Sequence, residues 1–364
     1  MAADGGSVNE QIVDLITDRA LDLQRLTAKQ RQDVAGFLRE LEGEIVAQLA
    51  KIDPTGISRT SYRAKRLDAL LKQVRSTIIA AYRSEATRLI GELRELADIE
   101  GEFAAASANR AIGVSMMTDG VSRSQLASLV EGVLVQGSPI NEWWERQAGD
   151  TLQRFTDQMR LGIAQGETNG QLIRRVRGGT QNGELVKGLM QTSRSHADSL
   201  VRAATQAVSQ KARQTTYDAN ADIIKALMWA STIDMKTTLD CAARDQKLYT
   251  VVDHKPIDHS LPWGGGPGNL HWGCRSTSAP QMRSWRELGF DIDELPPSTR
   301  ASMDGQIAAD TSFEGWLNKR TKAQQDEYLG PGRASMWRDG GLSLRDLVDG
   351  NGRELTLEQL RKRT

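Results

Sequence analysis

The sequence predicts a predominantly helical α+β protein, with a long helical N-terminal region, a small α+β module around residues 221–295 and a helical C-terminal tail. Three observations support this fold class. Apolar residues recur at three- and four-residue steps over most of the first 220 positions, which is helical periodicity. Two short apolar runs then follow, separated by a loop rich in glycine and proline. Beyond them, the pattern again favours short helices.

The N-terminal region carries two apolar stripes. The first runs from Val8 to Leu49, and the polar positions Thr27 to Gln30 favour a break that would divide it into two helices. Pro54-Thr55-Gly56 ends this segment, because proline lacks an N–H donor and glycine tolerates positive φ. The second stripe runs from Leu67 to Leu96 and predicts one long amphipathic helix.

The central region is helical but more interrupted. Gly137-Ser138-Pro139 precedes a helix over Glu142 to Ile163, and closely spaced glycines between residues 166 and 183 predict short segments. A longer helix is predicted from Ser193 to Ala219.

The α+β module has two predicted strands, Ala226 to Ile233 and Arg275 to Pro280. Leu227 and Trp229 should pack its core. A loop with the glycine run Gly264 to Gly268 lies between the strands, and Leu295-Pro296-Pro297 separates the module from the tail. These changes of character divide the chain into four predicted regions: 1–115, 116–220, 221–297 and 298–364.

Composition excludes several classes of protein. The 47 Lys and Arg residues balance 47 Asp and Glu residues, which argues against a chain that coats nucleic acid. No run approaches the roughly 20 apolar residues of a membrane helix, so we expect no membrane association. The first residues show neither the basic flank nor the apolar segment of a secretory signal. With two cysteines and no such signal, we expect a protein of the reducing cytoplasm.

Both cysteines, Cys241 and Cys274, border one short window that also contains His254, His259 and His271. Zinc prefers four nitrogen or sulfur ligands, and His271 with Cys274 supplies one His-x-x-Cys pair. With Cys241, the pair gives three candidate ligands, which His254, His259 or Asp245 would have to complete.

Two alternatives to a metal site remain open at this window. The cysteines can be small buried hydrophobic residues, with His271 bonded to the backbone. A disulfide between Cys241 and Cys274 is not expected in a reducing compartment.

The catalytic signals are weak. Cys274 is followed by Arg275, which would favour a thiolate in a cleft, but no third orienting group stands at a recognisable spacing. The run Gly264 to Gly268 lacks the Gly-Lys-Ser/Thr ending of a phosphate loop. We therefore expect no enzyme.

Two basic clusters could contact DNA phosphates or remain solvated. They are Arg174, Arg175 and Arg177 before Gly178-Gly179, and Arg361, Lys362 and Arg363 at the end of the sequence.

Two motifs in the module point to a family. The segment from Leu239 to Tyr249, followed by Leu270 to Ser276, resembles the phage Mu F-like minor head proteins, a family of phage head morphogenesis proteins. The matching residues are Asp240, Cys241, Arg244, Asp245, Tyr249, His271, Cys274 and Arg275.

Other segments fit the same family. The helix from Ser199 to Asn220 and the tail pieces 309–317, 328–333 and 341–348 are similar to it in order and character. Two positions depart from the family pattern: Gln246 replaces a glycine, and Ser276 replaces the last cysteine of a His-x-x-Cys-Arg-Cys element. The second change removes one candidate zinc ligand.

The resemblance implies a structural minor head protein of a tailed bacteriophage. Such a protein would bind the portal protein and the major capsid or scaffold proteins, with non-specific contact to packaged DNA. Its place would be the virion head at the portal vertex, and the host cytoplasm during assembly. We expect no cofactor. Cys241, His271 and Cys274 are the residues that could hold a structural zinc ion, and the loss of a cysteine at Ser276 makes that ion less expected. The alternative is a metal-dependent nuclease that uses His271 and Cys274 with Asp245 or Asp258.

Overall fold

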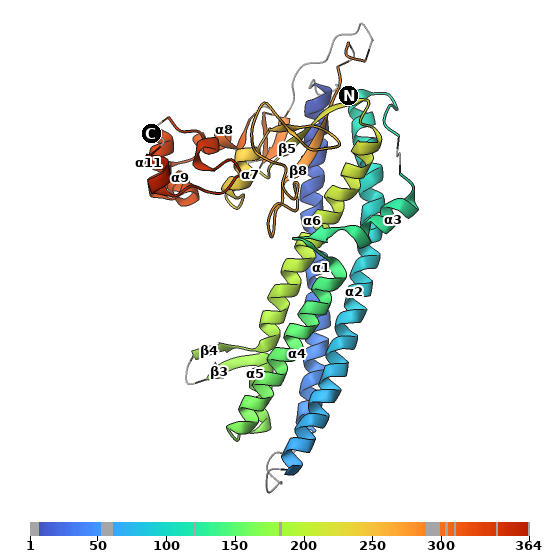
Figure 1. Ribbon diagram of the computed structural model, residues 1–364, viewed down its shortest axis with the longest axis vertical. Coiled ribbons are helices and arrows are strands. Elements are labelled where there is room, and N and C mark those ends of the chain that lie inside the picture. The colour runs from blue at the N-terminus through green and yellow to red at the C-terminus, as the bar shows by residue number, and fades with distance from the viewer. Residues whose placement is uncertain are drawn as a thin grey trace. The chain divides into compact units, whose positions relative to one another are not determined.

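The computed structural model describes residues 7–51, 61–118, 121–181, 184–284, 286–288, 299–302, 305–308, 311–339 and 341–362 (Figure 1). The predicted fold class is confirmed, because this part of the chain forms long and short α-helices with small antiparallel sheets. Two of the predicted breaks, Pro54-Thr55-Gly56 and Leu295-Pro296-Pro297, lie outside the described residues.

The chain forms two compact units, each assembled from separate stretches of sequence. We call residues 25–93 and 131–205 the bundle unit, and residues 1–24, 94–130 and 206–364 the sheet unit. The four consecutive regions expected from the sequence stay a prediction.

The bundle unit is built on four helices that lie side by side (Figure 1). They come from α1 (Val8–Ala50), α2 (Ser61–Ile112), α4 (Ile140–Ala164) and α6 (Leu189–Ala219). At its centre the rings of Phe37, Tyr82 and Trp144 pack edge to face, with Phe37 and Tyr82 centroids 5.3 Å apart. The Tyr82 hydroxyl bonds Thr151 Oγ1 at 2.9 Å, and Thr151 Oγ1 bonds Ser193 Oγ at 2.8 Å. The apolar stripes thus bury one short chain of hydroxyl groups.

The predicted break in the first helix is wrong, because α1 runs through Thr27 and Gln30 without interruption. Both side chains are buried. Gln30 accepts a hydrogen bond at 2.7 Å from the Thr205 hydroxyl of α6 and donates one at 3.4 Å to Glu92 of α2. These polar residues therefore belong to the inward face of a continuous helix, and no glycine or proline interrupts it there.

Short elements complete the bundle unit. A hairpin of β1 (Leu134–Val135) and β2 (Ser138–Pro139) precedes α4 in the bundle unit, whereas nearly all of α3 (Arg123–Gly132), which ends just before this hairpin, belongs to the sheet unit. The glycine-punctuated stretch forms α5 (Asn169–Arg177) and an antiparallel hairpin of β3 (Gly178–Gln181) and β4 (Glu184–Lys187), which the sequence did not predict. Helix α6 begins at Leu189, four residues before the predicted start.

The sheet unit contains a four-stranded antiparallel sheet with the order β7-β6-β5-β8. Its strands are β5 (Ile224–Ala230), β6 (Leu248–Tyr249), β7 (Pro256–Ile257) and β8 (Thr277–Met282). Both predicted strands exist, but β5 ends three residues early and β8 begins two residues late. Pro280 is tolerated in β8 because this strand lies at the edge of the sheet.

Helices cover this sheet through one apolar cluster. Ile12 and Ile16 of α1, Ala104 and Ala108 of α2, and Tyr217 of α6 pack against Leu227 of β5. Trp229 lies in a second buried cluster with Cys241, Tyr249 and Cys274. Leu227 and Trp229 are fully buried, as predicted.

The C-terminal tail packs on a short helix, α7 (Leu239–Arg244), which the sequence did not predict. The predicted tail helices are confirmed as α8 (Phe313–Asn318), α9 (Lys322–Leu329), α10 (Pro331–Asp339), the 3₁₀ helix η1 (Leu344–Leu347) and α11 (Leu357–Arg361). A hairpin of β9 (Thr299–Ser302) and β10 (Gly305–Ala308) was not predicted. Among the described residues, no helix has both the length and the apolar character of a membrane span.

Candidate functional site

Two short segments of the sheet unit bring Cys241, His271 and Cys274 together. Cys241 lies in the first turn of α7, which Thr238 caps by accepting the backbone N–H of Cys241 at 3.4 Å. His271 and Cys274 lie in the loop before β8. The Cys274 N–H donates to the His271 carbonyl at 3.0 Å, and Gly273 closes this turn with a φ of +74°.

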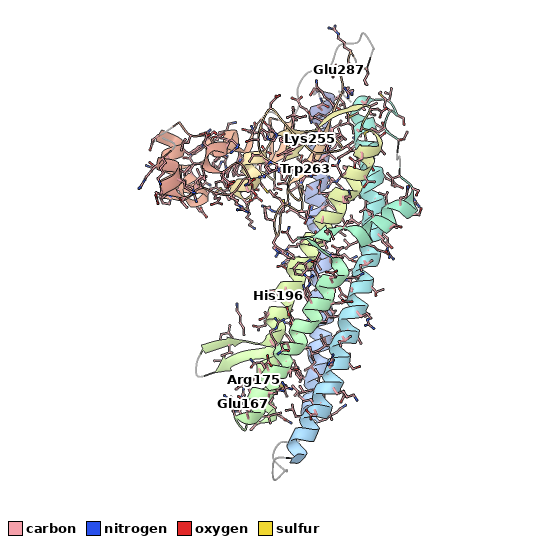
Figure 2. The ribbon with its side chains drawn as sticks, in the orientation of Figure 1. Glu167, Arg175, His196, Lys255, Trp263 and Glu287 are labelled. Atoms are coloured by element: carbon pink, nitrogen blue, oxygen red, sulfur yellow. The ribbon has the colours of Figure 1, made fainter. Side chains whose placement is uncertain are left out.

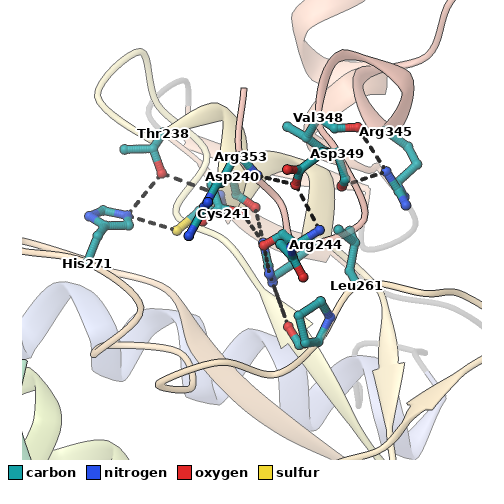
Figure 3. A network of polar contacts seen from close by, with 12 residues as sticks. Thr238, Asp240, Cys241, Arg244, Leu261, His271, Arg345, Val348, Asp349 and Arg353 are labelled. Atoms are coloured by element: carbon teal, nitrogen blue, oxygen red, sulfur yellow. Dashed lines mark hydrogen bonds and ion pairs between the residues drawn. The ribbon is translucent and has the colours of Figure 1, made fainter. Parts of the chain in front are cut away.

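The three side chains form a tight cluster, and Figure 3 shows His271 beside Cys241 and Thr238. Cys241 Sγ is 3.7 Å from Cys274 Sγ and 3.2 Å from His271 Nε2, and the ligand atoms all lie within 4.8 Å of one another. Both cysteines are buried and reduced, and His271 is half-buried. Within the described part of the chain, no other group of His, Cys, Asp or Glu side chains has this arrangement.

The two sulfur atoms share one environment but differ in acidity. A hydrogen bond from the Cys274 thiol lowers the pKa of Cys241, although burial opposes the effect. The same contact with Cys241, together with burial, raises the pKa of Cys274 well above its ordinary value. Cys241 is therefore the first of the pair to become a thiolate.

Arg244 ties α7 to two other segments of the sheet unit (Figure 3). Its buried guanidinium forms an ion pair with Asp240 on the same helix. It also donates to the Pro262 carbonyl at 3.1 Å and to the Asn351 carbonyl at 3.3 Å. Burial raises the pKa of Asp240, and the Arg244 charge offsets part of that rise. Arg244 thus acts as a structural clamp.

Asp245 is a second clamp. Its buried carboxylate accepts the Ser231 N–H at 2.8 Å and the Phe313 N–H at 2.9 Å. These bonds join the residue after β5 to the first residue of α8. Asp245 does not belong to the Cys–His cluster, and Asp258 is an exposed residue. The acidic group that a metal-dependent nuclease would need is therefore not assembled from these two side chains.

Arg275 and Tyr249 also have structural surroundings. Arg275 forms a two-pronged ion pair with Asp234, with nitrogen–oxygen distances of 2.5 and 2.6 Å. Burial would raise the pKa of Asp234, but the Arg275 hydrogen bonds and charge outweigh it and lower the pKa. The Tyr249 ring packs against Trp229 and Trp263, and burial raises the pKa of Tyr249 to about 12.

The sequence did not single out three residues that shape this site. Thr238 both caps α7 and places its Oγ1 2.9 Å from His271 Nε2, and a threonine three residues before Cys241 is a recognisable capping signal. Asp234 and Gly352 carried no such signal. Asp234 pairs with Arg275, and Gly352 lies against Asp240, and both of these contacts join residues that are distant in sequence.

The other two candidate histidines lie elsewhere in the loop. His254 stacks on the Trp263 ring with a centroid distance of 4.6 Å, and His259 Nε2 lies 2.9 Å from the Leu248 carbonyl. Burial lowers the pKa of both. Neither completes the ligand set of Cys241, His271 and Cys274.

The bundle unit has a separate polar cleft of about 350 Å³ beside the β3–β4 hairpin. Arg154, Arg174 and Lys187 line it. Arg175 also lines the cleft, but its guanidinium already donates hydrogen bonds of 2.6 Å to the side chains of Glu167 and Gln158. Figure 2 labels Glu167 and Arg175 together at this end of the bundle unit.

The fold and the site define a helical α+β protein whose sheet unit is organised around a buried Cys–His–Cys cluster and its polar clamps. Residues 153–279 match the family model described as Phage Mu protein F like protein, which confirms the resemblance found in the sequence. The matched segment is about a third of the length of the chain. No curated protein and no solved structure matches the chain significantly.

Proposed function

We propose that this chain is a structural minor head protein of a tailed bacteriophage, which supports assembly of DNA-filled heads by binding portal and capsid or scaffold proteins. The observation that carries the proposal is the family match over residues 153–279. That segment contains the β3–β4 hairpin, α6 and the complete Cys–His–Cys cluster. Most of the motif residues clamp the fold, which agrees with a non-enzymatic role.

The β3–β4 hairpin supports a protein partner. Leu185 is 80% exposed and Val186 is 46% exposed, and both lie on strand β4 of a separate two-stranded ribbon. Successive strand residues point to opposite faces, so each face of this ribbon exposes one large apolar side chain that a partner protein could cover. We assign this surface to the portal protein, with capsid or scaffold proteins as the alternative partners.

The polar cleft beside the hairpin supports contact with packaged DNA. Arg174 and Lys187 are exposed at its mouth, and Arg154 lies deeper. Contacts between such cations and phosphates are independent of sequence and sensitive to salt. Because the formal net charge of the chain is zero, we expect DNA to contact this cleft and not the protein surface in general. The expected location is the virion head at the portal vertex, after assembly in the host cytoplasm.

The experiment is co-purification with the portal protein of the same phage. We expect the intact chain to retain the portal protein, and the double variant Leu185→Asp with Val186→Asp to lose it while keeping its circular dichroism spectrum. Leu161→Asp is the matched control, because Leu161 is 45% exposed on α4 and lies outside the hairpin. Equal retention by all three proteins would exclude the hairpin as the docking surface.

Mass spectrometry of purified heads and proheads tests virion membership directly. We expect the chain at low stoichiometry relative to the major capsid protein. Its complete absence from both particles would overturn the proposed function.

A further inference from the structure

The spacing of the three donor atoms matches a tetrahedral metal site. Two thiolates bound to one tetrahedral zinc ion lie about 3.8 Å apart, and a thiolate and an imidazole nitrogen lie about 3.5 Å apart. The corresponding distances are 3.7 Å between Cys241 Sγ and Cys274 Sγ, and 3.2 Å between Cys241 Sγ and His271 Nε2. Two cysteines that served only as buried hydrophobic residues would need no histidine nitrogen beside the Cys241 sulfur.

The orientation of His271 is the one a metal ligand needs. Its Nδ1 lies 3.0 Å from the Trp272 carbonyl, which can accept only from a protonated nitrogen. Nε2 is then the unprotonated nitrogen, and it faces the Cys241 sulfur and the Thr238 hydroxyl. An outer hydrogen bond of this kind fixes the tautomer of histidine ligands in metal sites. A bound ion would replace the Thr238 hydroxyl at Nε2.

Ser276 lies beside both sulfur atoms of the cluster. Its hydroxyl contacts the Cys241 sulfur, and its backbone N–H faces the Cys274 sulfur. The side chain is 2% exposed, and its oxygen has no hydrogen-bond partner of normal geometry. A sulfur atom is only a weak hydrogen-bond partner for a buried hydroxyl, and a metal-bound position would satisfy this hydroxyl more fully.

We propose that Cys241, His271 and Cys274 bind one Zn²⁺ ion, with the Ser276 hydroxyl at the fourth position. Two thiolates and one imidazole select zinc among the common divalent cations of cells. The ion would join α7 to the loop before β8 and act as a structural cross-link of the sheet unit. This site does not depend on the assembly role, so the failure of one proposal leaves the other standing.

The test is metal binding by the purified full-length chain. We expect one mole of zinc per mole of chain, and an intense near-ultraviolet band from Co²⁺–thiolate bonding that disappears when Zn²⁺ is added. Cys274→Ser and His271→Ala should each weaken zinc binding at least tenfold. His196→Ala is the matched control, since His196 is exposed on α6, and it should bind zinc like the unchanged chain.

A variant with increased zinc affinity tests the fourth position, because its result cannot be explained by damage to the fold. Ser276→Cys should place a third thiolate on the ion and tighten zinc binding by roughly 10- to 100-fold. Unchanged affinity in Ser276→Cys would overturn the role of Ser276. A chain that takes up no zinc or Co²⁺, or that forms a Cys241–Cys274 disulfide in the presence of zinc, would overturn the site.

Discussion

The bundle unit and the sheet unit reach stability by different means. In the bundle unit, long helices pack through apolar stripes. A few polar side chains form hydrogen bonds between these helices, such as Tyr82 with Thr151 and Thr205 with Gln30. In the sheet unit, the parts of α1, α2 and α6 that cover the sheet are joined by short strands and helices, such as β6 with two residues and α10 with nine. Short elements bury little surface each, so polar side chains must hold them in place.

The polar side chains of the sheet unit bind mainly to backbone groups of distant segments. Arg244 reaches carbonyls at positions 262 and 351, and Asp245 reaches N–H groups at positions 231 and 313. Each of these side chains connects segments that also pack together in one apolar cluster. The comparison of the two units indicates a structural role for motif residues such as Arg244 and Asp245, which hold the short elements of the sheet unit together.

The largest effect is expected for the aromatic centre of the sheet unit. Trp229→Ala should lower the free energy of unfolding by about 3–5 kcal/mol, because the indole is fully buried and its removal leaves a cavity. Trp272→Ala is the control: Trp272 is 45% exposed and should change stability by less than about 0.5 kcal/mol. Urea unfolding followed by circular dichroism measures both. Equal effects would show that Trp229 is not part of a packed core.

Substitutions of Asp245 and Tyr82 compare a charged side chain that bonds the backbone in the sheet unit with a neutral hydrogen bond in the bundle unit. Asp245→Ala should cost about 3 kcal/mol, because it leaves two buried backbone N–H groups without a charged acceptor. Tyr82→Phe removes one neutral hydrogen bond from the bundle unit and should cost about 1 kcal/mol. The two variants are compared by the same unfolding measurement. A larger loss for Tyr82→Phe would contradict the distinction between the units.

The same difference explains how far the sequence predicted the fold. Helical stripes such as Leu67 to Leu96 are local patterns, so the long helices of the bundle unit were predicted well. The break expected at Thr27 to Gln30 was wrong because the partner that satisfies Gln30 is Thr205, which is 175 residues away. No local pattern contains that information. The hairpin at Gly178 to Lys187 was missed because its strands lack an alternating apolar pattern.

The sequence predicted which residues form the candidate site better than it predicted what each residue does there. The clustering of Cys241, His271 and Cys274 in sequence indicated one site, and the structure places them together. Asp245 was a candidate ligand or acid, yet both its oxygens accept bonds from distant backbone groups. Whether a side chain binds a metal or clamps a backbone depends on what the rest of the fold brings to it.

A smaller effect is expected where the tail meets α7. Gly352 has a φ of +88°, and a Cβ atom there would lie 2.0 Å from Asp240 Oδ1. Gly352→Ala should therefore cost about 2 kcal/mol, from backbone strain and from displacement of the Asp240–Arg244 pair. Gly350→Ala is the control, because a Cβ at Gly350 meets no atom within 4 Å. Thermal unfolding of the two variants should separate them, and equal melting temperatures would contradict the close contact at Gly352.

The smallest effect concerns the ion pair of Asp234 and Arg275, and it depends on pH. Asp234→Asn should cost about 1 kcal/mol at neutral pH, because it removes the negative partner of a partly buried pair. The pKa of Asp234 is lower in the folded chain than the ordinary aspartate value of about 3.9, so the pair stabilises the fold above that value. The contribution is lost as the pH falls through the folded-state pKa.

Unfolding measured from pH 7 to pH 3 should therefore show the unchanged chain and Asp234→Asn converging at the acid end. Glu358→Gln is the control, since Glu358 and Lys362 form an exposed pair on α11 that should contribute little at any pH. A difference between the chain and Asp234→Asn that grows as the pH falls would have the wrong sign for a carboxylate held ionised by Arg275. The pair would then not be a clamp of the loop that leads from β5 to Cys241.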